Sequence, residues 1–220
     1  MAISSKIGKQ IRHINQSLIK TSFQVDYNFV SSRNGIIVWE GFKDISSALK
    51  NLPYNDIYNE CLKARAFNFK LIDGALIQLM YSCKRDDILR HRLAFYPNPD
   101  VERYQDNPEG FEEAHFGREL FTEVYEKKAL IFPVRFDFDS DDKKYVEHNH
   151  SYSHLTLGNY ENCRIPVSRP VSPFQFIVFI LKNFYHDRFN DYYDNKSFNC
   201  NLQFESLLSE EEKSRIHLSL

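Results

Sequence analysis

The sequence predicts an α+β fold: an antiparallel or partly mixed sheet of about five to seven strands, a buried helix over residues 174–188 and flanking helices. The chain carries 19 Phe and 13 Tyr against only 7 Gly, and such aromatic side chains favour strands and fill a core. Short apolar segments also follow one another with tight-turn residues between them, and helical patterns are inserted among them. We expect residues 1–220 to form a single domain.

An amphipathic helix is predicted within residues 1–22, from Ile3 to about Lys20. Its apolar stripe consists of Ile3, Ile7, Ile11, Ile14 and Leu18. Basic residues lie off this stripe, at Lys6, Lys9, Arg12 and Lys20. Ser4 or Ser5 is the expected N-cap. A narrow stripe of this kind suits docking onto the domain or pairing with a helix of a partner.

Tight turns place the strands of the first half. The predicted strands cover residues 23–30, 36–39, 67–72, 75–83 and 88–96, and the predicted helices cover 44–51 and 54–66. Asn34-Gly35 and Asp73-Gly74 are the turn residues of the two expected hairpins. Alternation along the last strand puts His91 on its apolar face and Arg90 and Arg92 on the opposite face.

The second half combines a central hairpin with further helices. Strands are expected over residues 132–139, around 154–157 and over 162–167, helices over 111–127 and 174–188, and loops over 97–110 and 190–201. The helix over 174–188 is apolar nearly all round, which predicts that it is buried against the sheet. Ser209 and Glu212 form a capping box that starts a short terminal helix.

The central hairpin concentrates the polar chemistry of the chain. Its core face is expected to hold Phe132, Val134, Phe136, Phe138, Leu155 and Leu157. Arg135, Asp137 and Asp139 share the other face of the first strand, because successive side chains point to opposite sides. His154 and Thr156 share that face on the returning strand. The hairpin therefore predicts one apolar side and one side with carboxylates, a guanidinium and an imidazole.

A metal-dependent site is one interpretation of this polar face. Asp137 and Asp139 are close enough to share a divalent cation, and such a cation can activate water for hydrolysis. The candidate metal ligands are Asp137, Asp139, His150 and His154. The candidate catalytic residues are Asp137, Asp139, His154 and Arg164, with Arg164 or Arg135 stabilising an anion.

The alternative interpretation is a ladder of ion pairs. Arg90, Arg92, Arg135 and Arg164 can pair with the two aspartates across neighbouring strands, and such surface pairs contribute little stability and imply no function. The sequence contains no HExxH, GxSxG, GxGxxG or P-loop motif that would decide for an enzyme.

A binding surface is the remaining type of site. Arginines and tyrosines from one sheet face suit contacts with nucleic acid or protein, and the basic helix could add phosphate contacts. The candidate binding residues are Arg90, Arg92, Arg135, Lys6, Lys9 and Arg12.

Composition limits the possible classes. A net charge of −2 gives no overall basic signal for nucleic acid or for an anionic membrane. Four cysteines without CxxC spacing are interpreted as reduced thiols of a cytoplasmic protein. We expect no signal peptide and no membrane span, since the longest apolar run is too short to cross a bilayer.

Several sequence runs together resemble a known family. They are His91–Pro97, Arg135–Asp139, Ser153–Gly158, Asn162–Val167, Ser172–Ile177 and Asn183–Tyr185. In these runs the chain resembles the bacterial family catalogued as domain of unknown function 2290. The resemblance implies a bacterial cytosolic protein of mobile or defence-associated gene clusters, and it implies no activity. His154 and Arg164 lie inside the matching runs, whereas His148 lies outside them.

The sequence is consistent with two functions. The first is an accessory or recognition subunit of a bacterial system, antiviral or mobile-element associated, that binds a protein partner, nucleic acid or both. The second is a metal-dependent, nuclease-like hydrolase that uses Asp137, Asp139 and His154. A small toxin or antitoxin module is a third possibility. Convergence of these side chains in one concave pocket would favour the enzyme, and pairing across a convex or buried surface would favour the accessory role.

Overall fold

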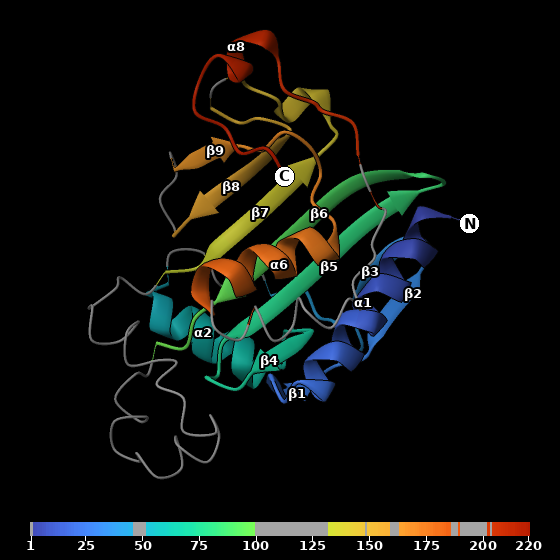
Figure 1. Cartoon of the computed structure of the whole chain (residues 1–220), viewed down its shortest axis with the longest axis vertical. Helices are drawn as coiled ribbons and strands as arrows, with labels where there is room; N and C mark the ends of the chain where they lie inside the picture. Colours follow the sequence, from blue (N-terminus) through green and yellow to red (C-terminus); the bar gives the residue numbers. More distant parts are fainter. Residues whose placement is uncertain are drawn as a thin grey trace.

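A computed structural model describes residues 2–45, 52–99, 132–147, 149–158, 163–185, 189, 202 and 204–220 (Figure 1). Its strands are β1 (Gln24–Tyr27), β2 (Val30–Arg33), β3 (Ile36–Trp39), β4 (Phe69–Leu71), β5 (Leu76–Lys84), β6 (Asp87–Tyr96), β7 (Val134–Asp139), β8 (Ser153–Leu157) and β9 (Arg164–Pro166). Its helices are α1 (Ile3–Lys20), α2 (Tyr54–Lys63), α6 (Pro173–Phe184) and α8 (Glu210–Lys213), with a 3₁₀ turn, η1 (Asp142–Lys144).

The α+β fold is confirmed, with one antiparallel sheet. The strand order is β1-β4-β5-β6-β7-β8-β9, and β3 also pairs with β5 while β2 pairs with β3. The described residues contain nine strands, more than the five to seven expected. The segment expected to form one strand over 23–30 contributes to two, β1 and β2, which at four residues each are too short to show separate alternating patterns.

The first hairpin has a different partner strand from the one predicted. Asn34-Gly35 joins β2 to β3, with Arg33 opposite Ile36, so the strand before the turn begins at Val30. β1 pairs with β4 instead. A two-residue turn requires paired residues directly on either side of it, and a strand over 23–30 would have ended three residues too early.

The stripe of α1 lies in the core, and the helix has the predicted bounds. The helix contacts β1, β2, β3, β5 and α6, so it docks on the rest of the chain in this structure. Its N-cap is Ala2, with no side-chain cap, which corrects the assignment to Ser4 or Ser5. Both serines already lie inside the first helical turn.

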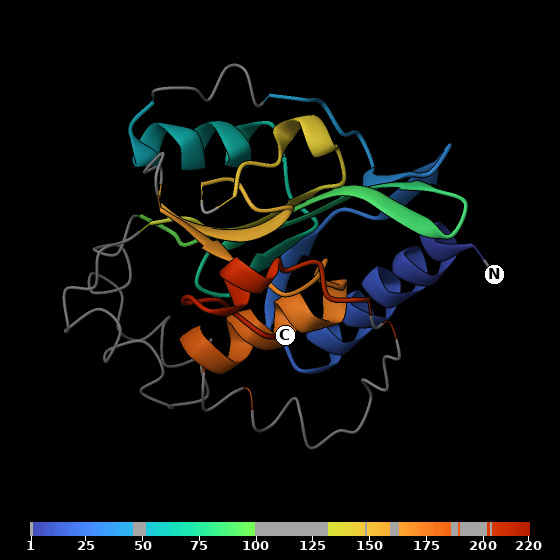
Figure 2. The same ribbon diagram turned by 90° about the horizontal axis from the view of Figure 1, so that it is seen from above.

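Helices cover both faces of the sheet (Figure 2). The larger core lies between the sheet and the layer of α1 and α6, where Phe136 packs edge-on against Phe176 at a centroid distance of 5.9 Å. α6 starts with a capping box of Ser172 and Gln175 and ends at Phe184. A smaller core lies under α2 on the other face, around Phe67. The polar side of the central hairpin lies on this same face, where Asp137 and His154 share a pocket with Trp39 of the smaller core.

Several predictions remain outside this description. The predicted helix over 111–127 and the loop over 190–201 lie outside the described residues, as does most of the predicted helix over 44–51. Among the described cysteines, Cys61, Cys83 and Cys163 are free thiols. Within the described helices, none is both long and apolar enough to span a bilayer.

Candidate functional site

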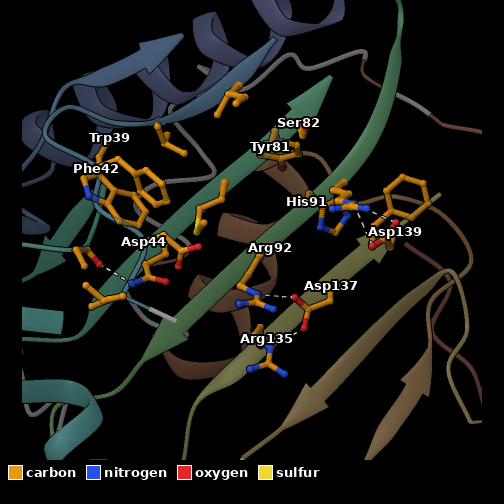
Figure 3. A pocket seen from close by; sticks show the side chains of 18 of the residues that line it. Trp39, Phe42, Asp44, Tyr81, Ser82, His91, Arg92, Arg135, Asp137 and Asp139 are labelled. Atoms are coloured by element: carbon orange, nitrogen blue, oxygen red, sulfur yellow. Dashed lines mark hydrogen bonds and ion pairs between the residues drawn. The ribbon is translucent and has the colours of Figure 1, made fainter. Parts of the chain in front are cut away.

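A pocket of about 500 Å³ opens on the sheet face opposite α1 and α6 (Figure 3). Its walls come from β3 and the residues that follow it, from β5 to β9, and from η1. Antiparallel pairing arranges its floor in rows across the strands. One row is Met80, Arg92, Asp137 and His154, a second contains Arg135 and Arg164 with the buried Thr156 between them, and a third contains Ser82, Arg90 and Asp139.

The predicted alternation of the central hairpin is confirmed. Asp137 lies opposite His154, and Phe136 lies opposite Leu155 on the other face. Phe136 and Leu155 belong to the core, whereas Asp137 and His154 line the pocket. The face assignments of β7 and β8 therefore follow from side-chain alternation alone.

Asp137 lies between two arginines. Nε of Arg92, on the neighbouring strand, is 2.9 Å from Oδ1, and Nε of Arg135, on the same strand, is 2.6 Å from Oδ2. Burial raises the pKa of Asp137, but Arg135 and Arg92 outweigh it, so the net pKa lies below its usual range. Asp137 is therefore a fixed negative charge that orients two guanidinium groups.

Asp139 is paired in a similar way. Arg90 Nε lies 3.1 Å and Lys144 Nζ 2.5 Å from its Oδ2. Burial raises the pKa of Asp139, while Lys144, the backbone N–H of Asp141 and Arg90 lower it, and the net shift is downward. Both carboxylates that sequence reasoning singled out are thus held by pairs of cations.

His154 is buried, and its hydrogen bond identifies which ring nitrogen carries the proton. Its Nδ1 lies 3.0 Å from the carbonyl oxygen of Ser151, which can only accept, so Nδ1 carries the proton of the neutral ring. Nε2 is then the basic nitrogen. Burial lowers the pKa of His154, although the Ser151 carbonyl and Asp137 favour the charged form. The ring of His150 lies 4.8 Å away, centroid to centroid, at the same wall of the pocket.

Arg164 differs from the other pocket arginines. It lies half-buried on β9, and its Nη1 is 3.3 Å from the carbonyl oxygen of Asn149. Within the described residues it forms no ion pair with a carboxylate, unlike Arg90, Arg92 and Arg135. A half-buried guanidinium next to other cations favours an anionic ligand at this position.

The chain matches one known family. The sequence profile of the family described as "Uncharacterized conserved protein (DUF2290)" covers residues 23–220. The chain belongs to this family. No curated protein and no solved structure matches it. All pocket residues of this DUF2290 chain fall inside the matched region, whereas α1 lies before it.

A metal centre has little support from the geometry of this DUF2290 chain. Asp137, Asp139, His150 and His154 all line the pocket, as the hypothesis required. In the part of the chain that the structure describes, however, no three His, Cys, Asp or Glu side chains are grouped so that they could hold a metal ion. In addition, cations already occupy the carboxylate oxygens that a metal would need. His148 lies outside the described residues.

The two predicted sets of basic residues do not come together. Arg90, Arg92 and Arg135 line the pocket. Lys6, Lys9 and Arg12 are exposed on α1, which packs on the opposite face of the sheet (Figure 2). The α1 cations therefore cannot contact a ligand held in the pocket and would need a separate one.

Part of the pocket was not found from the sequence. Trp39, Phe42 and Met80 form an apolar end, and Lys43 and Lys144 add charge. These residues come from β3, β5, η1 and the segment after β3. The place of Trp39, Phe42 and Lys43 beside the arginines depends on the pairing of β3 with β5 across more than 40 residues, which no local pattern reveals. The turn at Asn34-Gly35 was the available signal, because it fixes where β3 begins.

Proposed function

We propose that this chain is a recognition protein that binds nucleic acid through phosphate contacts in the arginine-rich pocket. The single observation that carries the proposal is the excess of positive charge there. The cationic residues of the pocket wall are Lys43, Arg90, Arg92, Arg135, Lys144 and Arg164, six in all, against Asp44, Asp137 and Asp139. The whole chain has a net charge of −2, so the excess is local.

Arginine geometry supports phosphate as the ligand group. Arg92 and Arg135 each use Nε to bond Asp137, and in the described part of the chain their Nη groups make no hydrogen bond. Guanidinium groups fixed in this way lose little side-chain entropy when they bind, and their remaining donors match phosphate oxygens. Arg164 adds a guanidinium without a carboxylate partner among the described residues.

The test is binding of fluorescein-labelled oligonucleotides, single-stranded and duplex, measured by anisotropy over a range of salt concentrations. Arg164→Gln should weaken binding and reduce the slope of log affinity against log salt by about 0.7 to 0.9. Arg33→Gln is the matched control, because Arg33 is exposed on β2 and lies outside the pocket. Equal affinity for Arg164→Gln and the parent protein, or no binding of either oligonucleotide, would overturn the proposal.

A protein partner is a further part of this proposal. It rests on the resemblance to a family of bacterial defence-associated or mobile-element gene clusters and on the exposed basic side of α1. Co-expression with the proteins encoded beside it, followed by purification, tests this. Charge reversal at Lys6, Lys9 and Arg12 should release a partner that uses α1 without changing oligonucleotide binding in the pocket.

A metal-dependent hydrolase is the second candidate, because Asp137, Asp139 and His154 do converge in one pocket with arginines. Mass spectrometry of the purified protein would reveal a bound metal. A stoichiometric metal that is lost in Asp137→Ala and His154→Ala, with the fold retained by circular dichroism, would make hydrolysis the leading function. We expect no such metal, since the carboxylates are already neutralised by cations.

A further inference from the structure

The pocket joins its cationic residues to an apolar, aromatic end, and this combination indicates a more specific ligand. We infer that the pocket takes one unpaired nucleotide of a single-stranded nucleic acid, with the base against Phe42 and the phosphate at the arginines. This inference rests on the proposed function and specifies which form of nucleic acid is bound.

Phe42 provides the surface for the base. It lines the pocket and is half-buried, so part of its ring remains accessible. Trp39 is only 3% exposed and packs edge-on against Phe42, with ring centroids 5.0 Å apart and planes at 72°. The buried Trp39 therefore holds the Phe42 ring in place. Figure 3 shows both rings at one side of the pocket, away from Asp139. Aromatic side chains of this kind stack on bases of any sequence.

The distribution of charge orients the nucleotide. Lys43 and Asp44 follow Phe42 in the chain and line the pocket, and the negative charge of Asp44 also acts on Arg92. The excess positive charge lies over β6 to β9, at the arginines and Lys144. Met80 on β5 and His154 on β8 occupy the same row, three strand spacings or about 14 Å apart. One nucleotide is shorter than this distance, so the phosphate of a base at Phe42 would lie at Arg92, which is directly opposite Met80, and not at the His154 end.

The size of the pocket favours one unpaired nucleotide over a duplex as the ligand. Its volume of about 500 Å³ is that of a site for a small molecule or one monomer unit. Proteins read duplex grooves with protruding helices or strands, whereas a recessed site receives a base that is unstacked and extruded. The arginines lie on the sheet itself at the floor of this recess, and the side chains of Arg90, Arg92 and Arg135 keep 57%, 44% and 31% of their surface exposed for a phosphate.

Trp39 makes the inference testable without a label, because it is the only tryptophan of the chain. Its fluorescence should change when a single-stranded oligonucleotide binds. An oligonucleotide of the same length and charge whose sugars lack bases should bind about tenfold more weakly and leave the fluorescence unchanged. The duplex should also bind more weakly than the single strand. These measurements use the unmodified protein, so they do not depend on whether a variant folds.

Variants at the aromatic end separate base stacking from charge. Phe42→Leu keeps most of the apolar volume but removes the ring, and it should reduce affinity for the single strand but not for the abasic strand. Phe29→Ala is the matched control, since Phe29 is 63% exposed and lies outside the pocket. Equal binding of normal and abasic strands would overturn this inference while leaving the proposed function intact. Failure of every oligonucleotide to bind would overturn both.

Discussion

Arg92 on β6 lies opposite Asp137 on β7, and its Nε is 2.9 Å from Oδ1. Arg135 reaches the other oxygen of the same carboxylate from two residues away along β7, at 2.6 Å. The carboxylate is therefore the centre of an arginine pair and is not an open metal ligand. Its charge both orients the two guanidinium groups and reduces the attraction of the pocket for anions, and these two effects can be separated by mutation.

Asp137→Asn should strengthen oligonucleotide binding about twofold to fivefold, because it removes a negative charge next to the phosphate position. The same change should lower the free energy of unfolding by about 1–2 kcal/mol, since one partly buried guanidinium group loses its acceptor oxygen and both lose the opposite charge. Anisotropy and urea denaturation measure the two effects. A metal-dependent hydrolase would behave in the opposite way and lose its function with this carboxylate.

Asp26→Asn is the control for that variant. Asp26 pairs with Arg65 through contacts of 2.7 and 2.9 Å at an exposed position outside the pocket. Asp26→Asn should change oligonucleotide binding very little, apart from a weak effect of overall charge. Weaker binding of Asp137→Asn than of Asp26→Asn would show that the orientation of the arginines matters more than the net charge of the pocket.

Because the His91 ring is buried, we expect the free energy of unfolding to fall in mild acid. Its Nε2 accepts a hydrogen bond of 2.9 Å from Val171 N–H, and Tyr81 donates to the carbonyl of the same residue. Burial lowers the pKa of His91 to about 4. In the unfolded chain the ring takes up a proton near pH 6.5, so the unfolded state binds more protons between these values. The contribution of His91 to the free energy of unfolding is therefore fully present above about pH 6.5. It falls by up to about 3 kcal/mol as the pH drops towards 4.

Urea denaturation at a series of pH values measures this loss. Burial also lowers the pKa of His154, so that residue adds to the loss in the same direction. His91→Gln should flatten the profile, because the group whose pKa is lowered by burial is removed. An NMR titration that places the His91 pKa above 6 would contradict the prediction even if the variant does not fold.

Local patterns in the sequence predicted the elements around the pocket but not the contacts within it. The stripe of α1 and the alternation of β7 follow from side-chain periodicity and agree with the structure. The partners of Asp137 depend on the register between β6 and β7, which are separated by almost 40 residues of chain. Side-chain alternation is equally consistent with Asp137 as a metal ligand and with Asp137 as an ion-pair partner. Only the register between β6 and β7 distinguishes the two roles. The apolar end of the pocket was missed for the same reason, because β3 reaches it by pairing with β5.

Asp73 is a buried carboxyl that should tolerate neutralisation. Its Oδ2 accepts from Tyr185 Oη at 2.6 Å and its Oδ1 from the N–H of Ala75 at 3.0 Å. Burial raises its pKa in spite of these hydrogen bonds. The folded state therefore favours the protonated form, and this residue's contribution to stability is present in acid and lost as the pH rises through the folded pKa.

Asp73→Asn should therefore leave the free energy of unfolding at neutral pH unchanged or higher. Tyr185→Phe should lower it by about 1–3 kcal/mol, because a buried acceptor loses its donor. Denaturation of both variants at neutral pH checks the pair of predictions. A larger loss for Asp73→Asn than for Tyr185→Phe would mean that the charged carboxylate is needed for folding.

Gly35 holds the β2–β3 turn against β5, and this contact supports the β3 side of the pocket. Its φ is +79°, and a Cβ at this position would lie 2.1 Å from the carbonyl oxygen of Cys83. Gly41, with φ +75°, is the matched control because a Cβ there would meet nothing within 4 Å.

Gly41→Ala should cost about 1 kcal/mol of unfolding free energy from backbone conformation alone. Gly35→Ala should cost at least about 2 kcal/mol more, because β3 must move away from β5. Urea denaturation compares the two, and Trp39 fluorescence reports whether β3 has shifted. Equal losses in the two variants would show that the turn relaxes without disturbing the sheet.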